Sequence, residues 1–332
     1  MKIIKVEDKK GIPKYKQIVQ SIENSIEKGL LKKDDKLPSV NSVCNKYGLS
    51  RDTVFTAFSE LRARGIIYSI PGKGNYIKST NINFVQSVFL LFDELNSFKE
   101  DLYNSLLEHL GKSAQVDIYF HHFNPKMFKS LIADSNGNYS SYIIMPANLE
   151  DTAPIINQLP KDKVFILDQM NTALLKYPGI YQNFSKDMYK ALKNGKSLID
   201  KYSRLKLVLT TSKQPKGMAI GFKDFAKEFN FEYEIITKPN GCDAKQGDVF
   251  VIPEDRDLVR IIKKAKKYNL EIGKDIGIIS YNDTSLKEVV ENGVTTISTD
   301  FKEMGKLLAE MVLKNEPKQI ENKSLLIVRS TL

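Results

Sequence analysis

The first eighty residues contain three stretches in which hydrophobic residues recur with the period of an α-helix. The first stretch has its apolar positions at Tyr15, Ile18, Val19, Ile22 and Ile26. The second covers 40–47, between the N-cap residue Ser39 and the helix-ending residue Gly48. The third begins after Ser50 and has an inner face made of Val54, Ala57, Phe58 and Leu61. This spacing predicts three amphipathic helices.

A short β-hairpin is predicted directly after the third helix, which Gly65 ends. Residues 66–70 and 75–78 can pair as two strands around the turn Pro71-Gly72-Lys73-Gly74. The turn carries a positive charge at its tip. Three helices followed by a hairpin predict a winged helix-turn-helix domain over residues 1–78.

From residue 84 onward, short apolar segments alternate with helical stretches. Strands are predicted at 88–92, 116–120, 142–145, 164–167, 205–209, 233–236, 249–252 and 276–279. The helices predicted between them include 102–110, 188–193 and 222–229. This alternation is typical of an α/β domain with parallel sheets, which we expect over 84–332. Residues 79–83 are polar and aperiodic, and they are predicted to be a linker.

The positive charge of the chain is concentrated in the predicted winged helix. The formal net charge is +10, and residues 1–80 hold 16 Lys plus Arg against 8 Asp plus Glu. The remaining residues are almost balanced, with 34 against 32. A basic N-terminal surface favours nucleic acid as a partner.

Composition also predicts where the protein resides. No apolar run approaches the roughly 20 residues of a membrane helix, and charges interrupt the first residues, so we expect neither a membrane span nor a signal peptide. Cys44 and Cys242 are far apart and form neither a zinc pattern nor a disulfide framework. We therefore expect a cytoplasmic protein.

The N-terminal motifs resemble those of GntR-type regulators. The matching segments are, in order, Leu37-Pro38-Ser39, Gly48-Leu49-Ser50-Arg51-Asp52-Thr53-Val54, Leu61-Arg62-Ala63-Arg64-Gly65-Ile66-Ile67 and Gly72-Lys73-Gly74. The resemblance implies operator DNA as the partner. It implies contacts to that DNA from Ser39, Ser50, Arg51, Thr53, Lys73 and Gly74.

These residue types suit DNA recognition. Arg51 can bind guanine or a phosphate through its planar fork, and Ser39 and Thr53 can donate to phosphates. Two positions leave alternatives open: Ser50 is either a helix cap or a DNA contact, and Phe55 either touches a thymine methyl group or is buried against a neighbouring helix. Because Phe55 and Asn41 depart from the residues common in the family, the operator sequence does not transfer.

The second domain resembles the sensor domains of LacI/GalR-type regulators, which are periplasmic-binding-protein-like. The segments that carry the resemblance are 164–168, 275–283, 294–300 and 328–330. The resemblance implies two lobes, lobe 1 at about 84–178 and 299–316 and lobe 2 at about 179–298 and 323–332, with chain crossings near 177–181, 298–302 and 315–322. It also implies an effector bound between the lobes and a homodimer.

Candidate effector-binding residues follow from the position of the predicted strands, because ligands of parallel sheets bind beyond the carboxyl ends of the strands. The candidates are Asp93, Asn96, Phe98, His121, Asn148, Asp168, Asn183, Lys213, Glu254, Asn282 and Asp283. Such polar groups suit a hydroxyl-rich ligand. The alternatives are a helix-capping role for Asp283 and support of the second lobe for Asp168, and Asp187 is expected to be a cap.

The resemblance to arabinose- and fucose-responsive regulators predicts a monosaccharide effector of the L-arabinose or L-fucose type. It also predicts a repressor of a carbohydrate-utilisation operon whose binding to DNA is relieved by the sugar. A non-sugar metabolite and transcriptional activation remain alternatives.

Metal binding, cofactors and catalysis are not predicted. Adjacent strand residues such as His121 and His122 point to opposite faces, and His109 has no partner one helical turn away. The sequence has no nucleophile elbow, no phosphate-binding glycine loop and no cysteine beside a base. An enzyme-like second domain would need a longer chain with a Schiff-base lysine, and a solute-binding protein would need a signal peptide.

Overall fold

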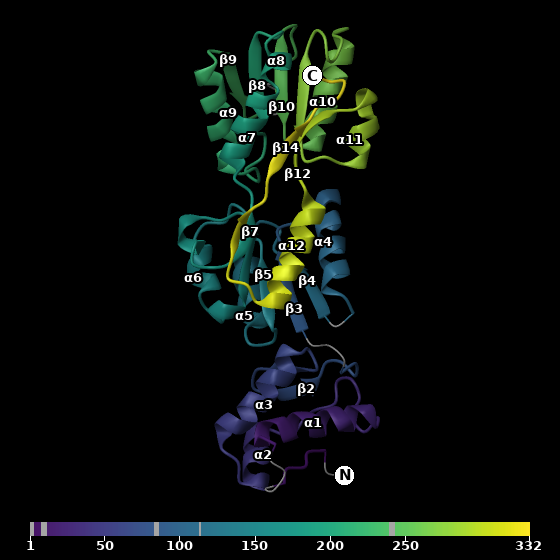
Figure 1. Ribbon diagram of the computed structural model, residues 1–332, viewed down its shortest axis with the longest axis vertical. Helices are drawn as coiled ribbons and strands as arrows, with labels where there is room; N and C mark the ends of the chain where they lie inside the picture. Colours follow the sequence, from purple (N-terminus) through teal and green to yellow (C-terminus); the bar gives the residue numbers. More distant parts are fainter. Residues whose placement is uncertain (1–2, 8–11, 83–85, 113, 239–242) are drawn as a thin grey trace.

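The computed structural model describes residues 3–7, 12–82, 86–112, 114–238 and 243–332. It consists of a winged-helix head and two α/β lobes stacked along one long axis (Figure 1). The last residue of the predicted linker, 83, the start of the second domain at 84 and Cys242 lie outside the described residues.

The head has the predicted winged-helix fold. Its elements are α1 (Lys14–Glu27), α2 (Val40–Tyr47), α3 (Arg51–Ala63), β1 (Ile67–Ile70) and β2 (Gly74–Ile77). β1 and β2 pair antiparallel, with Ile67 opposite Ile77 and Ile70 opposite Gly74. The apolar faces of the three helices and the hairpin meet in one buried core that includes Ile18, Ile22, Val54, Phe58, Leu61 and Ile77.

Local capping sets the helix boundaries in the head. The Ser39 hydroxyl accepts from the Ser42 amide at 3.1 Å, and the Ser50 hydroxyl accepts from the Thr53 amide at 3.2 Å. Gly48 ends α2 in the left-handed conformation, with φ at 61°. Because these signals act within a few residues, the sequence pattern located α2 and the start of α3 correctly.

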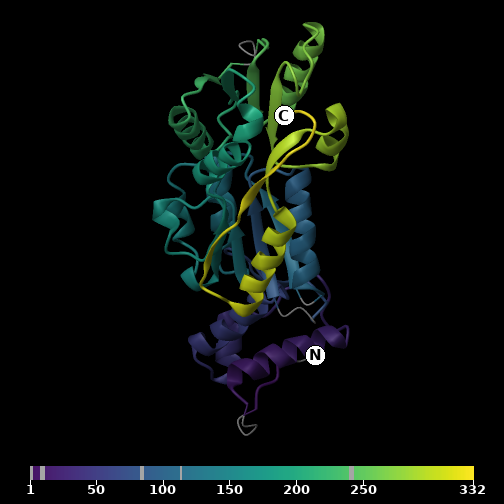
Figure 2. The same ribbon diagram turned by 45° about the horizontal axis from the view of Figure 1, so that its top comes forward.

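Lobe 1 is built on a six-stranded parallel sheet of order β13-β7-β6-β5-β3-β4. Its strands are β3 (Gln86–Phe92), β4 (Ala114–Phe120), β5 (Ser141–Ile144), β6 (Val164–Asp168), β7 (Gly179–Tyr181) and β13 (Gln319–Glu321). Its helices are α4 (Ser97–Leu110), α5 (Pro125–Ser135), α6 (Thr152–Ile156) and α12 (Phe301–Lys314). α4 and α12 pack side by side on one face of the sheet (Figures 1 and 2).

Lobe 2 repeats this architecture with a sheet of order β14-β12-β11-β10-β8-β9. Its strands are β8 (Arg204–Val208), β9 (Glu232–Ile236), β10 (Asp248–Ile252), β11 (Gly277–Tyr281), β12 (Thr295–Thr299) and β14 (Ser324–Ile327), and only β14 runs antiparallel to its neighbour among these described strands. Its helices are α7 (Phe184–Asn194), α8 (Lys196–Ile199), α9 (Lys216–Glu228), α10 (Asp255–Lys267) and α11 (Ser285–Val289). Short 3-10 turns lie at Lys161–Lys163, Thr172–Leu174 and Val290–Asn292.

The chain crosses between the lobes three times: after β7, after β12 and after β13. Two of the predicted lobe boundaries are wrong, because β7 and β13 both pair within the lobe 1 sheet. Residues 179–181 therefore belong to lobe 1, as do residues 319–321, which lie beyond the predicted end at 316. The C-terminal segment, yellow in Figures 1 and 2, runs from β13 to β14 along both lobes.

None of the helices within the described ranges is both long and apolar enough to cross a membrane.

Gly305 allows the close approach of α12 and α4. A Cβ atom at this position would lie 2.4 Å from the Leu102 carbonyl oxygen, which is backbone and cannot rotate away. We therefore expect Gly305→Ala to lower the free energy of unfolding by about 1–3 kcal/mol through overpacking. Urea denaturation measures this change.

Glu310→Ala on the same helix is the matched control, since Glu310 is half-exposed and its 3.5 Å ion pair with Lys314 lies at the surface. We expect it to change the unfolding free energy by less than about 0.5 kcal/mol. Equal stability of the two variants would contradict the close-packing argument.

Candidate functional site

The first turn of α3 presents polar and aromatic side chains to solvent. Arg51 is exposed, and the Phe55 side chain is 56% exposed. The burial alternative for Phe55 is therefore wrong, because its ring faces outward and lies 5.4 Å from the Arg62 guanidinium. Ser50 and Thr53 share a hydroxyl hydrogen bond of 2.8 Å in addition to the cap.

The wing adds a second exposed basic feature. Gly72 and Gly74 have φ values of 73° and 119°, which side-chain-bearing residues rarely adopt. These two glycines let the turn fold back so that Lys73 stands at its exposed tip. A basic tip on a tight turn is suited to contact the DNA backbone or minor groove.

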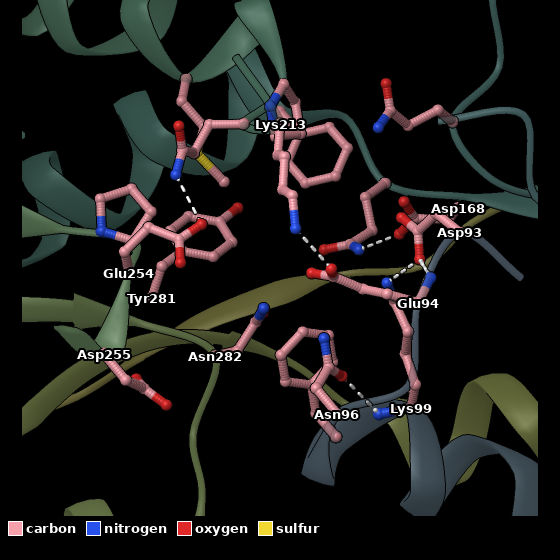
Figure 3. Close-up of a pocket in the computed structure, with 18 of the residues that line it drawn as sticks. Asp93, Glu94, Asn96, Lys99, Asp168, Lys213, Glu254, Asp255, Tyr281 and Asn282 are labelled. Atoms are coloured by element: carbon pink, nitrogen blue, oxygen red, sulfur yellow. Dashed lines mark hydrogen bonds and ion pairs between the residues drawn. The ribbon is translucent and has the colours of Figure 1, made fainter. Parts of the chain in front are cut away.

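A polar cavity of about 300 Å³ lies between the two lobes, where the carboxyl ends of the two sheets face each other (Figure 3). Seven predicted effector residues line it: Asp93, Asn96, Phe98, Asp168, Lys213, Glu254 and Asn282. The structure brings these seven residues together from both lobes. The cavity volume is at the lower end of the range of small-molecule sites.

Four predicted effector residues do not line this cavity. The His121 side chain is fully buried away from the cavity. Its Nε2 atom lies 3.0 Å from the Met145 carbonyl oxygen, and its ring packs edge-on against Phe128. Asp283 is held by two hydrogen bonds of 2.7 Å from Arg329. It does not cap the next helix either, since Thr284 is the N-cap of α11.

Asn148 and Asn183 line a neighbouring cavity instead. Asn183 is the N-cap of α7 and accepts from the Lys186 amide at 3.2 Å. The capping role expected of Asp187 therefore belongs to Asn183. Asp187 is buried in the first turn of the same helix, and burial raises its pKa to about 6.

Sequence reasoning missed several residues that line the cavity. They include Glu94, Lys99, Gln182, Phe184, Gln214, Asp255, Arg256, Tyr281 and Lys287. Some signals were available: Glu94 follows Asp93 directly, and Lys99 lies one turn into the helix that Asn96 caps. The position of Gln182 required knowledge of the crossing after β7.

Several charged side chains of the cavity form ion pairs. Lys99 pairs with Asp93, and Lys213 bridges the lobes to Glu94 at 2.6 Å (Figure 3). On lobe 2, the nearly buried Lys287 lies 2.9 Å from Asp255. Burial lowers the pKa of Lys287, and the carboxylate partner opposes this change. Pairing of this kind offsets the cost of removing the charges from water.

Asp168 is a second buried carboxyl group of the cavity, besides Asp93. It ends β6 in lobe 1, not in the second lobe, and its backbone is left-handed with φ at 73°. Burial raises its pKa to about 6, while nearby Lys99 opposes the shift. The Gln182 side-chain amide donates to its Oδ1 atom at 2.5 Å.

A loop of lobe 2 is fastened across the cavity by lobe 1. The Asn148 amide donates to the carbonyl oxygens of Lys213 at 3.0 Å and Gln214 at 2.7 Å. The Lys213 ammonium also lies 4.9 Å from the Phe123 ring centroid. Together with the Glu94 ion pair, these contacts hold the lobes together directly, which gives Asn148 a role in joining the lobes.

No cluster of three or more His, Cys, Asp or Glu side chains among the described residues could hold a metal ion.

A winged-helix head joined to two lobes with a polar cavity between them defines a class of ligand-responsive DNA-binding regulators. The comparisons agree with this class. Residues 14–77 match bacterial regulatory proteins of the gntR family, and residues 213–332 match the periplasmic-binding-protein-like domain. The chain is thus a transcription regulator with a GntR-type helix-turn-helix domain and a periplasmic-binding-protein-like domain.

Two curated relatives differ in how much of this chain they cover. The arabinose metabolism transcriptional repressor of Geobacillus stearothermophilus is 24% identical over 92% of this chain and 92% of its own length. The mannosyl-D-glycerate transport/metabolism system repressor of Escherichia coli (strain K12) is 34% identical over 32% of this chain and 41% of its own length.

Solved structures share the fold of the two-lobed domain. A dimeric Lac repressor aligns with a TM-score of 0.62 at 12% identity, over 74% of this chain and 98% of that chain. A LacI-type regulator from Alkaliphilus metalliredigens QYMF, complexed with D-xylulofuranose, aligns with a TM-score of 0.58 at 14% identity and the same coverage. At these identities the likeness establishes the fold alone.

The raised pKa of Asp168 predicts a pH-dependent stability. Because the folded-state pKa is about 6 and the unfolded value is near 3.8, the folded chain binds more protons between these values. The contribution of Asp168 to stability therefore falls as the pH rises through this window. We expect Asp168→Asn to gain about 1.4 kcal/mol of stability relative to the wild type between pH 5 and pH 8, because about one unit of the shift lies above pH 5.

Urea unfolding at the two pH values measures this gain, and Asp283→Asn is the matched control. Hydrogen bonds from Arg329 and Thr296 outweigh burial and lower the pKa of Asp283, so this variant should lose stability at both pH values. Asp187 titrates in both the wild type and the Asp168 variant, so its effect cancels. A gain for Asp168→Asn that does not increase with pH would show that Asp168 is not destabilised by burial of its charge.

Proposed function

We propose that this chain represses a carbohydrate-utilisation operon and that a monosaccharide held between the lobes changes its affinity for the operator. The observation that carries the proposal is the cavity of about 300 Å³ that both lobes line with carboxylate and amide groups. Phe98, Phe184 and Tyr281 add aromatic surface beside them. Polar groups with aromatic rings beside them suit a sugar ring, whose edge is hydroxylated and whose faces are apolar.

The sugar is of the L-arabinose or L-fucose type. The relative that aligns over 92% of both chains is named for arabinose metabolism, which supports a pentose or a similar six-carbon sugar. The small volume of the cavity supports a single ring.

DNA binding is assigned to Ser39, Ser50, Arg51, Thr53, Phe55, Lys73 and Gly74. Arg51 and Phe55 are exposed on the first turn of α3, and Lys73 is exposed on the wing. The head carries most of the net positive charge of the chain, so we expect operator binding to weaken as salt is raised. The regulator acts in the cytoplasm as a homodimer on two half-sites separated by one helical turn or more.

The effector acts through its unequal affinity for two arrangements of the lobes. A ligand shifts such an equilibrium only as far as its affinities for the two states differ. The contacts from Asn148 and Glu94 to the loop at Lys213 join the lobes, so a sugar in the cavity has to replace or reinforce them. The resulting change in lobe geometry alters the spacing of the two heads in the dimer.

Operator binding by the purified full-length protein tests the proposal. DNA from upstream of its own and neighbouring genes is titrated with and without a panel of monosaccharides that includes L-arabinose and L-fucose. We expect one sugar to release the DNA selectively. Tight DNA binding that no sugar alters would overturn the ligand class, and absence of DNA binding would overturn the regulator assignment.

Arg51→Ala tests the DNA-binding surface. We expect operator affinity to fall by about 1–3 kcal/mol, because a side chain that can bind a guanine or a phosphate is removed. Lys267→Ala removes an exposed positive charge from α10 of lobe 2 and should leave operator affinity unchanged. Equal losses for both variants would mean that net charge alone, and not the α3 surface, determines binding.

A further inference from the structure

Gln182 lies on the first crossing between the lobes, directly after β7. Its side chain is only 6% exposed and lines the cavity. The amide nitrogen donates to Asp168 at 2.5 Å, and the backbone amide of Gln182 donates to the Asp168 carbonyl oxygen at 2.9 Å. Two hydrogen bonds to one residue therefore fix the position of this side chain.

The carbonyl oxygen of the Gln182 side chain has no hydrogen-bond partner among the described residues, although it is buried. A buried acceptor without a partner is unfavourable, so such atoms are rare in folded proteins. The side-chain carbonyl oxygen of Asn282, on the lobe 2 side of the same cavity, is also buried and unpartnered among the described residues. The two atoms come from opposite sides of one cavity.

The cations of the cavity are already engaged, in contrast to these acceptors. Lys99, Lys213 and Lys287 each lie in an ion pair with a carboxylate. Arg256 is exposed, at the start of α10. In the described part of the chain, three buried atoms of the cavity lining have no partner: the carbonyl oxygens of Gln182 and Asn282, which accept, and the Tyr281 hydroxyl, which can donate or accept. None of them carries a charge, so they suit a ligand with neutral hydroxyl groups.

We infer that the Gln182 carbonyl oxygen accepts a hydrogen bond from the effector and, with Asp168, selects a neutral sugar whose hydroxyl groups donate, against an anionic sugar. This inference rests on the proposed sugar-responsive function and deepens it. A hydroxyl group directed at Gln182 satisfies the buried acceptor, whereas a carboxylate or phosphate in the same place is repelled by Asp168. Because Gln182 is on a crossing segment, a ligand bound there touches the part of the chain that joins the lobes.

Gln182→Met tests the inference, since methionine has a similar volume but cannot accept this hydrogen bond. Binding of L-arabinose, L-fucose and D-galactose to the full-length protein is measured by calorimetry, together with urea unfolding without sugar. We expect the variant to bind the preferred neutral sugar at least about tenfold more weakly, or about 1.4 kcal/mol. Without sugar it should be less stable than the wild type, because methionine also removes the hydrogen bond that Gln182 donates to the buried Asp168 carboxylate.

The comparison among the three sugars separates a ligand contact from a purely structural role, since a structural change alone would weaken the binding of all three sugars by the same factor. Gln158→Met makes the same chemical change at an exposed position of lobe 1 and should alter neither sugar binding nor stability. Retained operator binding shows that the variant is folded.

D-galacturonate provides the test of charge selection, because it differs from D-galactose by a carboxylate. We expect it to bind more weakly than D-galactose. Tighter binding of D-galacturonate, or equal sugar affinity of wild type and Gln182→Met, would overturn the inference. If the wild type binds operator DNA but no neutral sugar, the proposed sugar-responsive function itself fails.

Discussion

The meeting of two parallel sheets at their carboxyl ends is the constraint on which the rest of this structure depends. In each lobe the strand ends and the helix starts that follow them bring polar groups to one edge. Three crossings of the chain hold these two edges face to face. Charged side chains buried between the two edges lose contact with water and need partners of opposite charge. This explains the ion pairs of Lys99 and Lys287.

The head depends on a different and more local set of interactions. Its three helices and hairpin close one apolar core, and serine and glycine caps fix the helix ends. The head also contacts lobe 1: Lys78 pairs with Asp117, which in turn accepts from the Tyr139 hydroxyl at 2.8 Å. The head is therefore joined to lobe 1 by this ion pair as well as by the chain itself.

The balance of satisfied and unsatisfied groups distinguishes structural from ligand-facing residues in the cavity. Asp93 and Glu94 have cationic partners, whereas the carbonyl oxygens of Gln182 and Asn282 have none among the described residues. Groups whose hydrogen bonds are complete stabilise the lobes as they stand. Groups with an unpartnered acceptor can form a further hydrogen bond with a ligand.

The sequence by itself determined the winged helix, the α/β class of the second domain, the concentration of positive charge in the head and most strand-end candidates. Helix caps, hydrophobic periodicity and charge are local properties, so they can be seen in the chain without its partners. Only the tertiary structure decided which polar residues face the cavity. Asp283 accepts a hydrogen bond from Arg329, which is 46 residues away in the sequence. Gln182 lies at the cavity because it directly follows β7, which pairs with β6 in the lobe 1 sheet. Such choices depend on long-range contacts between segments, and the local pattern of a sequence does not contain them.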